Sequence, residues 1–141
     1  MNWKRKCYGL KKENAGITIT NRSNGKAQKL AEEFKINFGG FEDIDNLITG
    51  NEIIINTTSA GMAPNANASA IGGKELKKGK IVMDIVYKPI NTKLIKLAEK
   101  KGCMTITGDR MLLYQALRQF ELWTGTKPDF KSMEKELIKK I

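Results

Sequence analysis

The sequence predicts an α/β fold in which a mostly parallel sheet is flanked by helices. Two compact apolar segments, Glu52–Asn56 and Lys80–Val86, are typical of strands that are buried on both faces of a parallel sheet. Apolar residues elsewhere recur at helical spacing, as at Leu94, Leu97 and Ala98. Because strands and helices alternate along the chain, we expect a layered sheet with right-handed crossovers.

The elements expected in the first third of the chain follow from apolar spacing and β-branched residues. They are a helix over residues 2–13, on the spacing of Trp3, Cys7 and Leu10; a strand over Ile17–Thr20; a helix that Ser23 caps; a brief strand within 35–38; and a short helix or turn over Asp43–Ile48. Each of these expected strands is short, so the helical spacing of apolar residues provides most of the evidence for the elements in this part of the chain.

The rest of the chain continues the alternation after a loop that is rich in small residues. The expected elements are the strands Glu52–Asn56 and Lys80–Val86, a helix over 92–101 capped by Asn91, a strand over Met104–Ile106, a helix from Asp109 to about Thr124 and a last helix over 129–140. No repeat or linker divides the chain. We therefore expect one domain over residues 1–141.

Composition and charge exclude several classes of function. The net charge is +10, but the excess is nearly all Lys on helical segments, and no aromatic residues alternate with it as nucleic-acid stacking requires. The charge instead favours small anionic ligands. No apolar segment has the length of a membrane span or a secretory signal, so we expect a cytoplasmic protein. Cys7 and Cys103 match no metal spacing, and we expect no metal site.

Polar clusters follow the predicted strands at the points where the strands end. They are NRSNGK at 21–26, NTTSAGM at 56–62, DIVYKP at 84–89 and GDRMLLYQA at 108–116. Ligands of open α/β sheets bind beyond the carboxyl ends of the strands. The four clusters are therefore expected to line one crevice.

The first cluster suits a phosphate group. Asn21, Arg22, Ser23 and Lys26 supply an amide, a guanidinium, a hydroxyl and an ammonium at the end of a strand. An acidic residue here would bind the ribose hydroxyls of NAD, whereas an arginine fork pairs with the 2′-phosphate of NADP. A polar turn that caps the next helix is the alternative, and spacing alone leaves both open.

The other clusters carry similar pairs of alternatives. The side chains at 56–62 either cap a turn or contact a ligand, and Gly61 allows the backbone to approach a flat ring. Asp84 needs partners inside an apolar strand and is either a structural anchor or part of a site. Tyr87 either reaches into the crevice or lies half-buried in the core. The amide of Gln115 suits a polyol, or is simply exposed.

Taken in order, these clusters resemble the C-terminal cofactor-binding half of the shikimate dehydrogenase family. The landmarks are NRSNGKAQKLAEEF, NTTSAGM, DIVYKPINTKLIKLAEKKG and GDRMLLYQALRQFELWTG, and the similarity extends from about Tyr8 to about Pro128. The resemblance implies a Rossmann-like sheet and NADP-dependent reduction of 3-dehydroshikimate to shikimate in the cytosolic route to aromatic amino acids. Ser23 replaces the usual Thr, and Lys88-Pro89 stands where Asn-Pro is more usual.

The resemblance also implies a role for each site residue. Those implied to bind the cofactor are Asn21, Arg22, Ser23 and Lys26 at the 2′-phosphate, and Thr58, Ile85, Gly108 and Met111 at the nicotinamide. Tyr87 and Gln115 are implied to contact the substrate. No residue of this chain is assigned a catalytic role, because the Lys and Asp of the family come from a substrate domain that has no counterpart in the sequence.

The N-terminal segment differs from the family. MNWKRK stands where a strand and a glycine-rich pyrophosphate turn are expected, so the sequence predicts a truncated cofactor half that lacks its first strand. We expect little activity from this chain alone, and an exposed sheet edge through which it could form a homo-oligomer. The alternatives are a non-catalytic module that binds NADP or another phosphorylated ligand, and one half of a two-chain enzyme.

Overall fold

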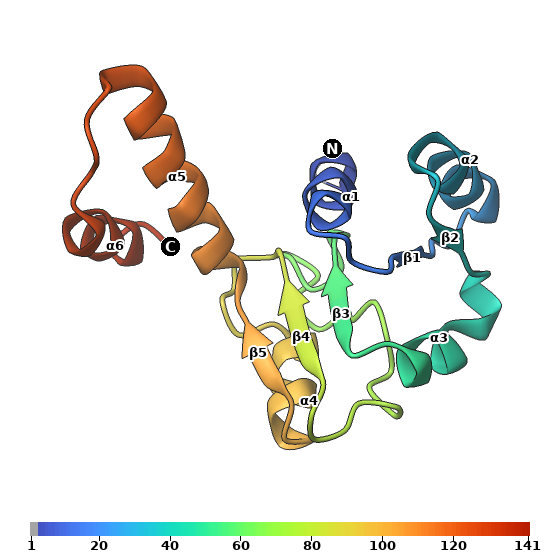
Figure 1. The fold of residues 1–141 in the computed structure, drawn as a ribbon. Coiled ribbons are helices and arrows are strands. Elements are labelled where there is room, and N and C mark those ends of the chain that lie inside the picture. The colour runs from blue at the N-terminus through green and yellow to red at the C-terminus, as the bar shows by residue number, and fades with distance from the viewer. Residues whose placement is uncertain (1–2) are drawn as a thin grey trace. The chain divides into compact units, whose positions relative to one another are not determined.

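The computed structural model describes residues 3–141 and confirms the predicted α/β class (Figure 1). The chain divides into two compact units, Met1–Asn51 and Glu52–Ile141. Both units contain parallel strands: α2 connects β1 with β2 and α4 connects β4 with β5, while a long loop connects β3 with β4. The single cofactor domain over residues 1–141 stays a prediction.

Unit 1 is a short βαβ arrangement with flanking helices. Its elements are α1 (Trp3–Lys12), β1 (Thr18–Ile19), α2 (Asn24–Phe34), β2 (Asn37–Phe38), the 3₁₀ turn η1 (Phe41–Asp43) and α3 (Ile44–Gly50). β1 and β2 pair in parallel, and α2 connects them with Ala27, Leu30 and Ala31 buried. The apolar spacing therefore predicted both the helix and its buried face.

The apolar row predicted for α1 consists of Trp3, Cys7 and Leu10. It is described only in part, because residue 2 and the side chain of Trp3 lie outside what the structure describes. Cys7 is buried, and this burial raises the pKa of its thiol. Leu10 is half-buried. The helix thus presents an apolar face at Cys7, as its spacing predicted.

Unit 2 is a three-stranded parallel sheet with helices. Its elements are β3 (Ile53–Asn56), β4 (Ile81–Asp84), α4 (Lys93–Lys100), β5 (Met104–Ile106), α5 (Gly108–Thr124) and α6 (Phe130–Ile138), and the strand order is β3-β4-β5. α4 lies against β4 and β5, as Figure 1 shows. Val82, Leu94, Ile95 and Ala98 are fully buried and form the centre of the core.

The prediction that Glu52–Asn56 is buried on both faces is wrong. Ile53 is 52% exposed, and the two isoleucines after it are only half-buried. The reason is that β3 ends the sheet, with β4 as its single strand neighbour in the described part of the chain. The Glu52 carbonyl accepts a hydrogen bond from the Ile81 amide of β4, and the Asn56 carbonyl accepts one from the Ile85 amide just after β4. Because backbone groups point to alternate sides along a strand, those of Ile53 and Ile55 point toward the unpaired edge. Association through this edge stays a prediction.

Helix caps differ from prediction in two places. α4 is capped by Thr92 rather than Asn91: the Thr92 hydroxyl accepts a hydrogen bond from the Ile95 amide at 3.3 Å. Ser23 does precede α2, but its side chain makes no capping hydrogen bond. The hydroxyl of Thr92 is preferred because it also reaches a buried carboxylate, which the adjacent Asn91 does not.

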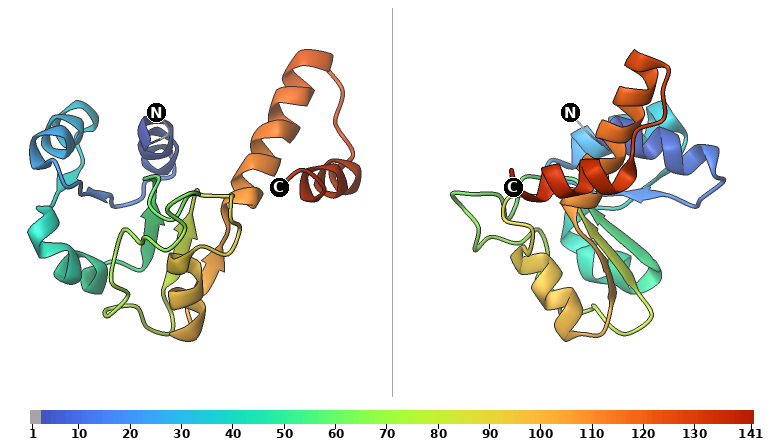
Figure 2. Two further views of the ribbon diagram at one scale, coloured as in Figure 1. Left: turned by 180° about the vertical axis from the view of Figure 1, so that it is seen from behind. Right: turned by 90° about the vertical axis from the view of Figure 1, so that its left-hand side faces the viewer.

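The two C-terminal helices pack mainly on each other. α5 begins at the carboxyl end of β5 and extends past the sheet, and the chain then returns so that α6 crosses α5 near its first turns (Figure 2). The rings of Tyr114 and Phe130 lie 6.0 Å apart, and Arg110 forms an ion pair with Glu134. Within residues 3–141, no helix has the length and apolar character that crossing a bilayer requires.

Candidate functional site

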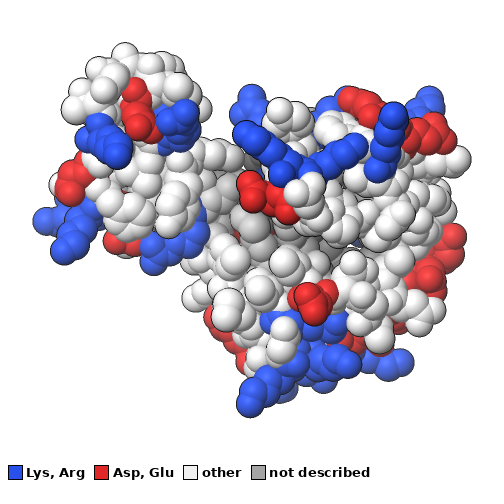
Figure 3. Space-filling view, in the orientation of Figure 1, with Lys and Arg blue, Asp and Glu red and all other residues white. Residues whose placement is uncertain are grey.

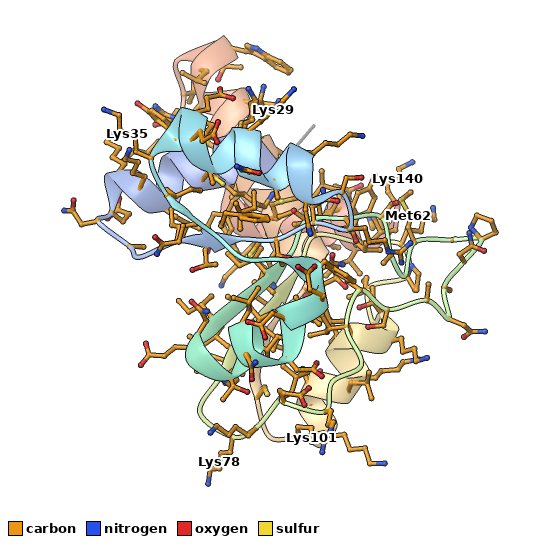
Figure 4. The ribbon with its side chains drawn as sticks, turned by 90° about the vertical axis from the view of Figure 1, so that its right-hand side faces the viewer. Lys29, Lys35, Met62, Lys78, Lys101 and Lys140 are labelled. Atoms are coloured by element: carbon orange, nitrogen blue, oxygen red, sulfur yellow. The ribbon has the colours of Figure 1, made fainter. Side chains whose placement is uncertain are left out.

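The strongest candidate site in unit 2 lies where its parallel strands end. β3 pairs with β4 so that Asn56 is opposite Asp84, the last residue of each strand. The loops after these strands therefore begin at the same edge of the sheet. Met62, in the loop after β3, lies at the end of the unit opposite to Lys78 and Lys101 (Figure 4).

Asp84 is the centre of a buried hydrogen-bond network at this edge. Its side chain is fully buried. Oδ1 accepts hydrogen bonds from Asn56 Nδ2 and from the Val86 amide, both at 3.0 Å, and Oδ2 accepts one from Thr92 Oγ1 at 2.7 Å. Three donors compensate for the loss of water around a buried carboxylate. Of the two alternatives that the sequence left open, these contacts favour the structural anchor.

The same network shapes the loop after β3. Asn56 Oδ1 accepts hydrogen bonds from the backbone amide of Thr58 at 3.0 Å and from its hydroxyl at 2.8 Å. The Thr58 hydroxyl in turn accepts one from the Ala60 amide at 3.1 Å. Gly61 follows with φ of 92°, a conformation that suits glycine. The polar side chains of this cluster thus form a capped turn, and the exposed Thr58 marks its outer surface.

A close backbone contact joins the start of α5 to the segment after β4. A Cβ placed on Gly108 would lie 2.4 Å from the Val86 carbonyl oxygen and 2.5 Å from that of Ile85. Only glycine fits at this distance. Ile85 and Gly108, two residues expected at the nicotinamide, therefore lie together, and Met111 follows on the first turn of α5 in a half-buried position.

The two residues expected to bind substrate are on the surface of unit 2. Tyr87 is 40% exposed, directly after the buried Val86. Gln115 is exposed on α5, one turn beyond Met111. The amide of Ala63 donates a hydrogen bond to the Lys88 carbonyl at 3.2 Å and so connects the loops after β3 and β4. The side chains of Tyr87 and Gln115 are thus accessible to a small molecule.

Unit 1 holds a second candidate site at the start of α2. Asn21 Oδ1 accepts a hydrogen bond from the Ser23 amide at 3.1 Å, so this side chain forms the polar turn that the sequence allowed. Arg22 and Lys26 are exposed and make no ion pair within residues 3–141. The hydroxyl of Thr20, just before the cluster, is buried and has no hydrogen-bond partner there. Two cations and a hydroxyl at a helix start suit an anionic group.

A carboxylate that the sequence did not single out is attached to this cluster. The side-chain amide of Asn24 donates a hydrogen bond to Glu42 Oε2 at 3.1 Å, while its oxygen accepts one from the Phe41 amide at 3.2 Å. The backbone amide of Glu42 and the side chain of Asn24 hold the pKa of Glu42 below its ordinary value. The carboxylate is therefore ionised at neutral pH and opposes an anion bound nearby.

Comparison with known families decides what this chain is. Residues 7–101 match the family described as shikimate / quinate 5-dehydrogenase. The chain belongs to this family. Residues 110–138 match the shikimate 5′-dehydrogenase C-terminal domain. The match over most of the chain confirms the resemblance seen in its sequence motifs.

Several named relatives share this similarity. The chain is 44% identical over 144 residues to the NADP(+) shikimate dehydrogenase of Methanococcus maripaludis strain C7, covering 96% of this chain and 50% of the relative. The corresponding enzyme of Pyrococcus abyssi is 39% identical, with 90% and 47% covered. The chain thus spans about half the length of the curated relatives that it matches.

Solved structures of this family have the same fold. Quinate dehydrogenase from Corynebacterium glutamicum in complex with NAD superposes with a TM-score of 0.89 at 29% identity, over 98% of this chain and 51% of that one. Shikimate 5-dehydrogenase from Thermus thermophilus, with NADP(H) and shikimate, gives 0.86 at 27% identity, over 96% and 50%. These similarities confirm the Rossmann-like fold.

Proposed function

We propose that this chain binds NADP and forms the cofactor half of a shikimate dehydrogenase that converts 3-dehydroshikimate to shikimate in the cytoplasm. Family membership and the names of the archaeal relatives support the activity. The observation that carries the cofactor assignment is that Arg22 and Lys26 are exposed at the start of α2 and make no ion pair in the described part of the chain.

The residues of unit 1 fit the adenosine end of the cofactor. Arg22 would place its planar fork against the 2′-phosphate, with Lys26 as a second cation. The Ser23 hydroxyl makes no capping hydrogen bond to α2, and it would donate to a phosphate oxygen. Asn21 would act indirectly, because its side-chain oxygen holds the turn that presents these groups.

The residues of unit 2 fit the reacting end of the cofactor. The close contact between Gly108 and the backbone of Ile85 and Val86 holds the start of α5 against the segment after β4, and a nicotinamide ring would bind beside this junction. Met111 and Thr58 would border this junction. When bound, NADPH would supply the hydride for carbonyl reduction, and Tyr87 and Gln115 would orient the substrate by hydrogen bonds to its hydroxyls.

No group in this chain is assigned to protonate the oxygen of the reduced carbonyl. General acid catalysis typically contributes about 10²–10⁴ in rate, so we expect the chain to bind cofactor but to turn over little substrate by itself. The part of the relatives that this chain does not match would supply that group. We therefore expect this chain to give a clear signal in a cofactor-binding assay and little signal in a turnover assay.

Calorimetric titration with NADP and with NAD tests the proposal. We expect NADP to bind roughly 10–100-fold more tightly, as one or two charged hydrogen bonds to the extra phosphate require. Equal affinity for the two cofactors would contradict the role of Arg22. Preference for NAD would instead favour a function like that of the quinate dehydrogenase solved with NAD.

A further inference from the structure

Two turns of unit 2 repeat the same three residues and are not used by the site described above. Lys77-Lys78-Gly79 leads into β4, and Lys100-Lys101-Gly102 leads into β5. The glycine of each turn has a positive φ, 95° at Gly79 and 73° at Gly102, which is a conformation that suits glycine. The backbone of the turns thus explains the two glycines, but it does not explain the two pairs of lysines.

The pairing of β4 with β5 places the two turns side by side. Ile81 and Met104 are the first residues of these strands, and they are register partners in the parallel pair. Each of them comes two residues after the glycine of its turn. Because paired strands lie about 4.8 Å apart, the two lysine pairs begin at matching positions on neighbouring strands.

Contacts between the turns confirm that they are close together. A Cβ placed on Gly102 would lie 3.6 Å from the Cβ of Lys78, and the thiol of Cys103 donates a hydrogen bond to the Lys77 carbonyl at 3.2 Å. Figure 4 shows Lys78 and Lys101 at the same end of unit 2. All four lysines of the turns are exposed, and we call them the lysine array: Lys77, Lys78, Lys100 and Lys101.

No carboxylate neutralises the lysine array. None of its members forms an ion pair with any residue from 3 to 141. The nearest acidic residues along the chain are Glu75 and Glu99, and Glu99 Oε1 accepts a hydrogen bond from the Thr105 hydroxyl at 3.5 Å instead. Figure 3 shows Lys and Arg side chains gathered at the end of unit 2 where β4 and β5 begin.

The stability of the fold accounts for only part of the lysine array. Lys100 is in the last turn of α4, where a cation interacts favourably with the helix dipole. Lys77 and Lys78 are not in a helix, so this reason does not apply to them. Like charges on neighbouring strands destabilise a sheet. An exposed group of cations that the fold does not require indicates a surface for an anionic partner.

The surroundings of the array favour a protein as this partner. Residues 74–80 and 99–106 contain no aromatic residue on which a nucleic-acid base could stack. Met104, two residues after Gly102, is 65% exposed. An apolar side chain beside four cations suits a partner that offers both carboxylates and an apolar contact, which a chain of phosphates does not.

We propose that the lysine array, together with Met104, is a docking surface for a protein segment that carries a row of carboxylates next to an apolar side chain. The array would attract the carboxylates and speed association, and Met104 would supply the apolar contact. The surface lies at the starts of β4 and β5, whereas the candidate site lies at the ends of the strands. Partner and cofactor are therefore expected to bind independently.

Fluorescence anisotropy with a labelled peptide tests the proposal. In the peptide, two leucines are flanked on each side by three glutamates. Replacing all four lysines of the array by serine is expected to weaken binding roughly tenfold, because each exposed ion pair contributes about a factor of two. Met104→Ser is expected to weaken binding of the peptide but not of inorganic tripolyphosphate. The matched control replaces four other exposed lysines by serine and should weaken binding less than about threefold: Lys127, Lys131, Lys135 and Lys140.

Several outcomes would overturn the docking surface. An equal loss in the two fourfold variants would show a general effect of net charge, and no binding to the parent chain would remove the surface altogether. Tighter binding of a short RNA of the same charge would indicate a nucleic-acid partner instead. A lower melting temperature of the array variant would show that the lysines serve the fold. Titration of NADP into the parent chain and the array variant separates this proposal from the proposed function, because cofactor affinity is expected to be equal in both.

Discussion

The polar cluster after β1 and the polar residues at the ends of β3 and β4 look alike in the sequence and differ completely in the structure. In unit 1, Arg22 and Lys26 are exposed and make no ion pair in the described part of the chain. In unit 2, Asn56 and Asp84 are buried, and Asp84 accepts three hydrogen bonds. One cluster leaves its charges available to a ligand, and the other uses its charge to hold loops in place.

The difference teaches that a polar side chain at a strand end is not by itself evidence of binding. A buried carboxylate must satisfy its own hydrogen bonds before it can do anything else, and the network around Asp84 does so completely. Exposed cations cost little to leave unpaired, because water solvates them. We therefore expect substitutions in unit 2 to act on stability and substitutions in unit 1 to act on affinity.

The largest expected effect comes from Asp84→Ala. It leaves Asn56 Nδ2, the Val86 amide and the Thr92 hydroxyl without their acceptor, which should lower the free energy of unfolding by about 3 kcal/mol or more. Chemical denaturation followed by circular dichroism measures the loss. Asp84→Asn keeps one acceptor oxygen and should lose clearly less. If both variants were as stable as the parent, the network would not hold the loops.

A smaller effect is expected from Arg22→Ala, and it changes the affinity for the cofactor rather than the free energy of unfolding. The affinity for NADP should fall about 10–100-fold, with little change for NAD, because one charged donor to the 2′-phosphate is lost. Stability should change by less than about 0.5 kcal/mol, as for an exposed side chain. Lys29→Ala, which removes the same charge from further along α2 (Figure 4), is the control. A matching loss in that variant would indicate a general effect of charge.

The smallest effect, and one of opposite sign, is expected from Glu42→Gln. This change removes a negative charge beside Asn24, two residues after Arg22, and should raise the affinity for NADP about twofold. The gain should shrink at high salt, where exposed charges are screened. Calorimetric titration at two salt concentrations measures both. A lower affinity in this variant would mean that Glu42 positions the cluster rather than opposing the phosphate.

Local patterns in the sequence predicted most of the fold. The spacing of Ala27, Leu30 and Ala31 predicted α2 and its buried face, and the apolar strand at Val82 predicted the core of unit 2. These features depend only on neighbours along the chain. The exposure of Ile53 could not be predicted in this way, because it depends on β3 having one strand neighbour instead of two.

The candidate site was predicted less completely than the fold. Its residues came from motifs, but the partners of Asp84 came only from the structure, since Asn56 is 28 positions away along the chain. Thr92 was missed in favour of Asn91 for the same reason: its second hydrogen bond is to Asp84. Glu42 was missed because the strand-end motif stops at Lys26, while the carboxylate reaches the cluster through Asn24 from a later turn.

The most direct measurement uses ligands that contain only the adenosine end of the two cofactors. Adenosine 2′,5′-bisphosphate and adenosine 5′-phosphate are titrated into the isotope-labelled chain while its backbone amide signals are followed by NMR. The bisphosphate is expected to bind more tightly and to shift the signals of residues 21–26 first. Equal affinity for the two compounds, or shifts confined to other residues, would contradict recognition of the 2′-phosphate by Arg22.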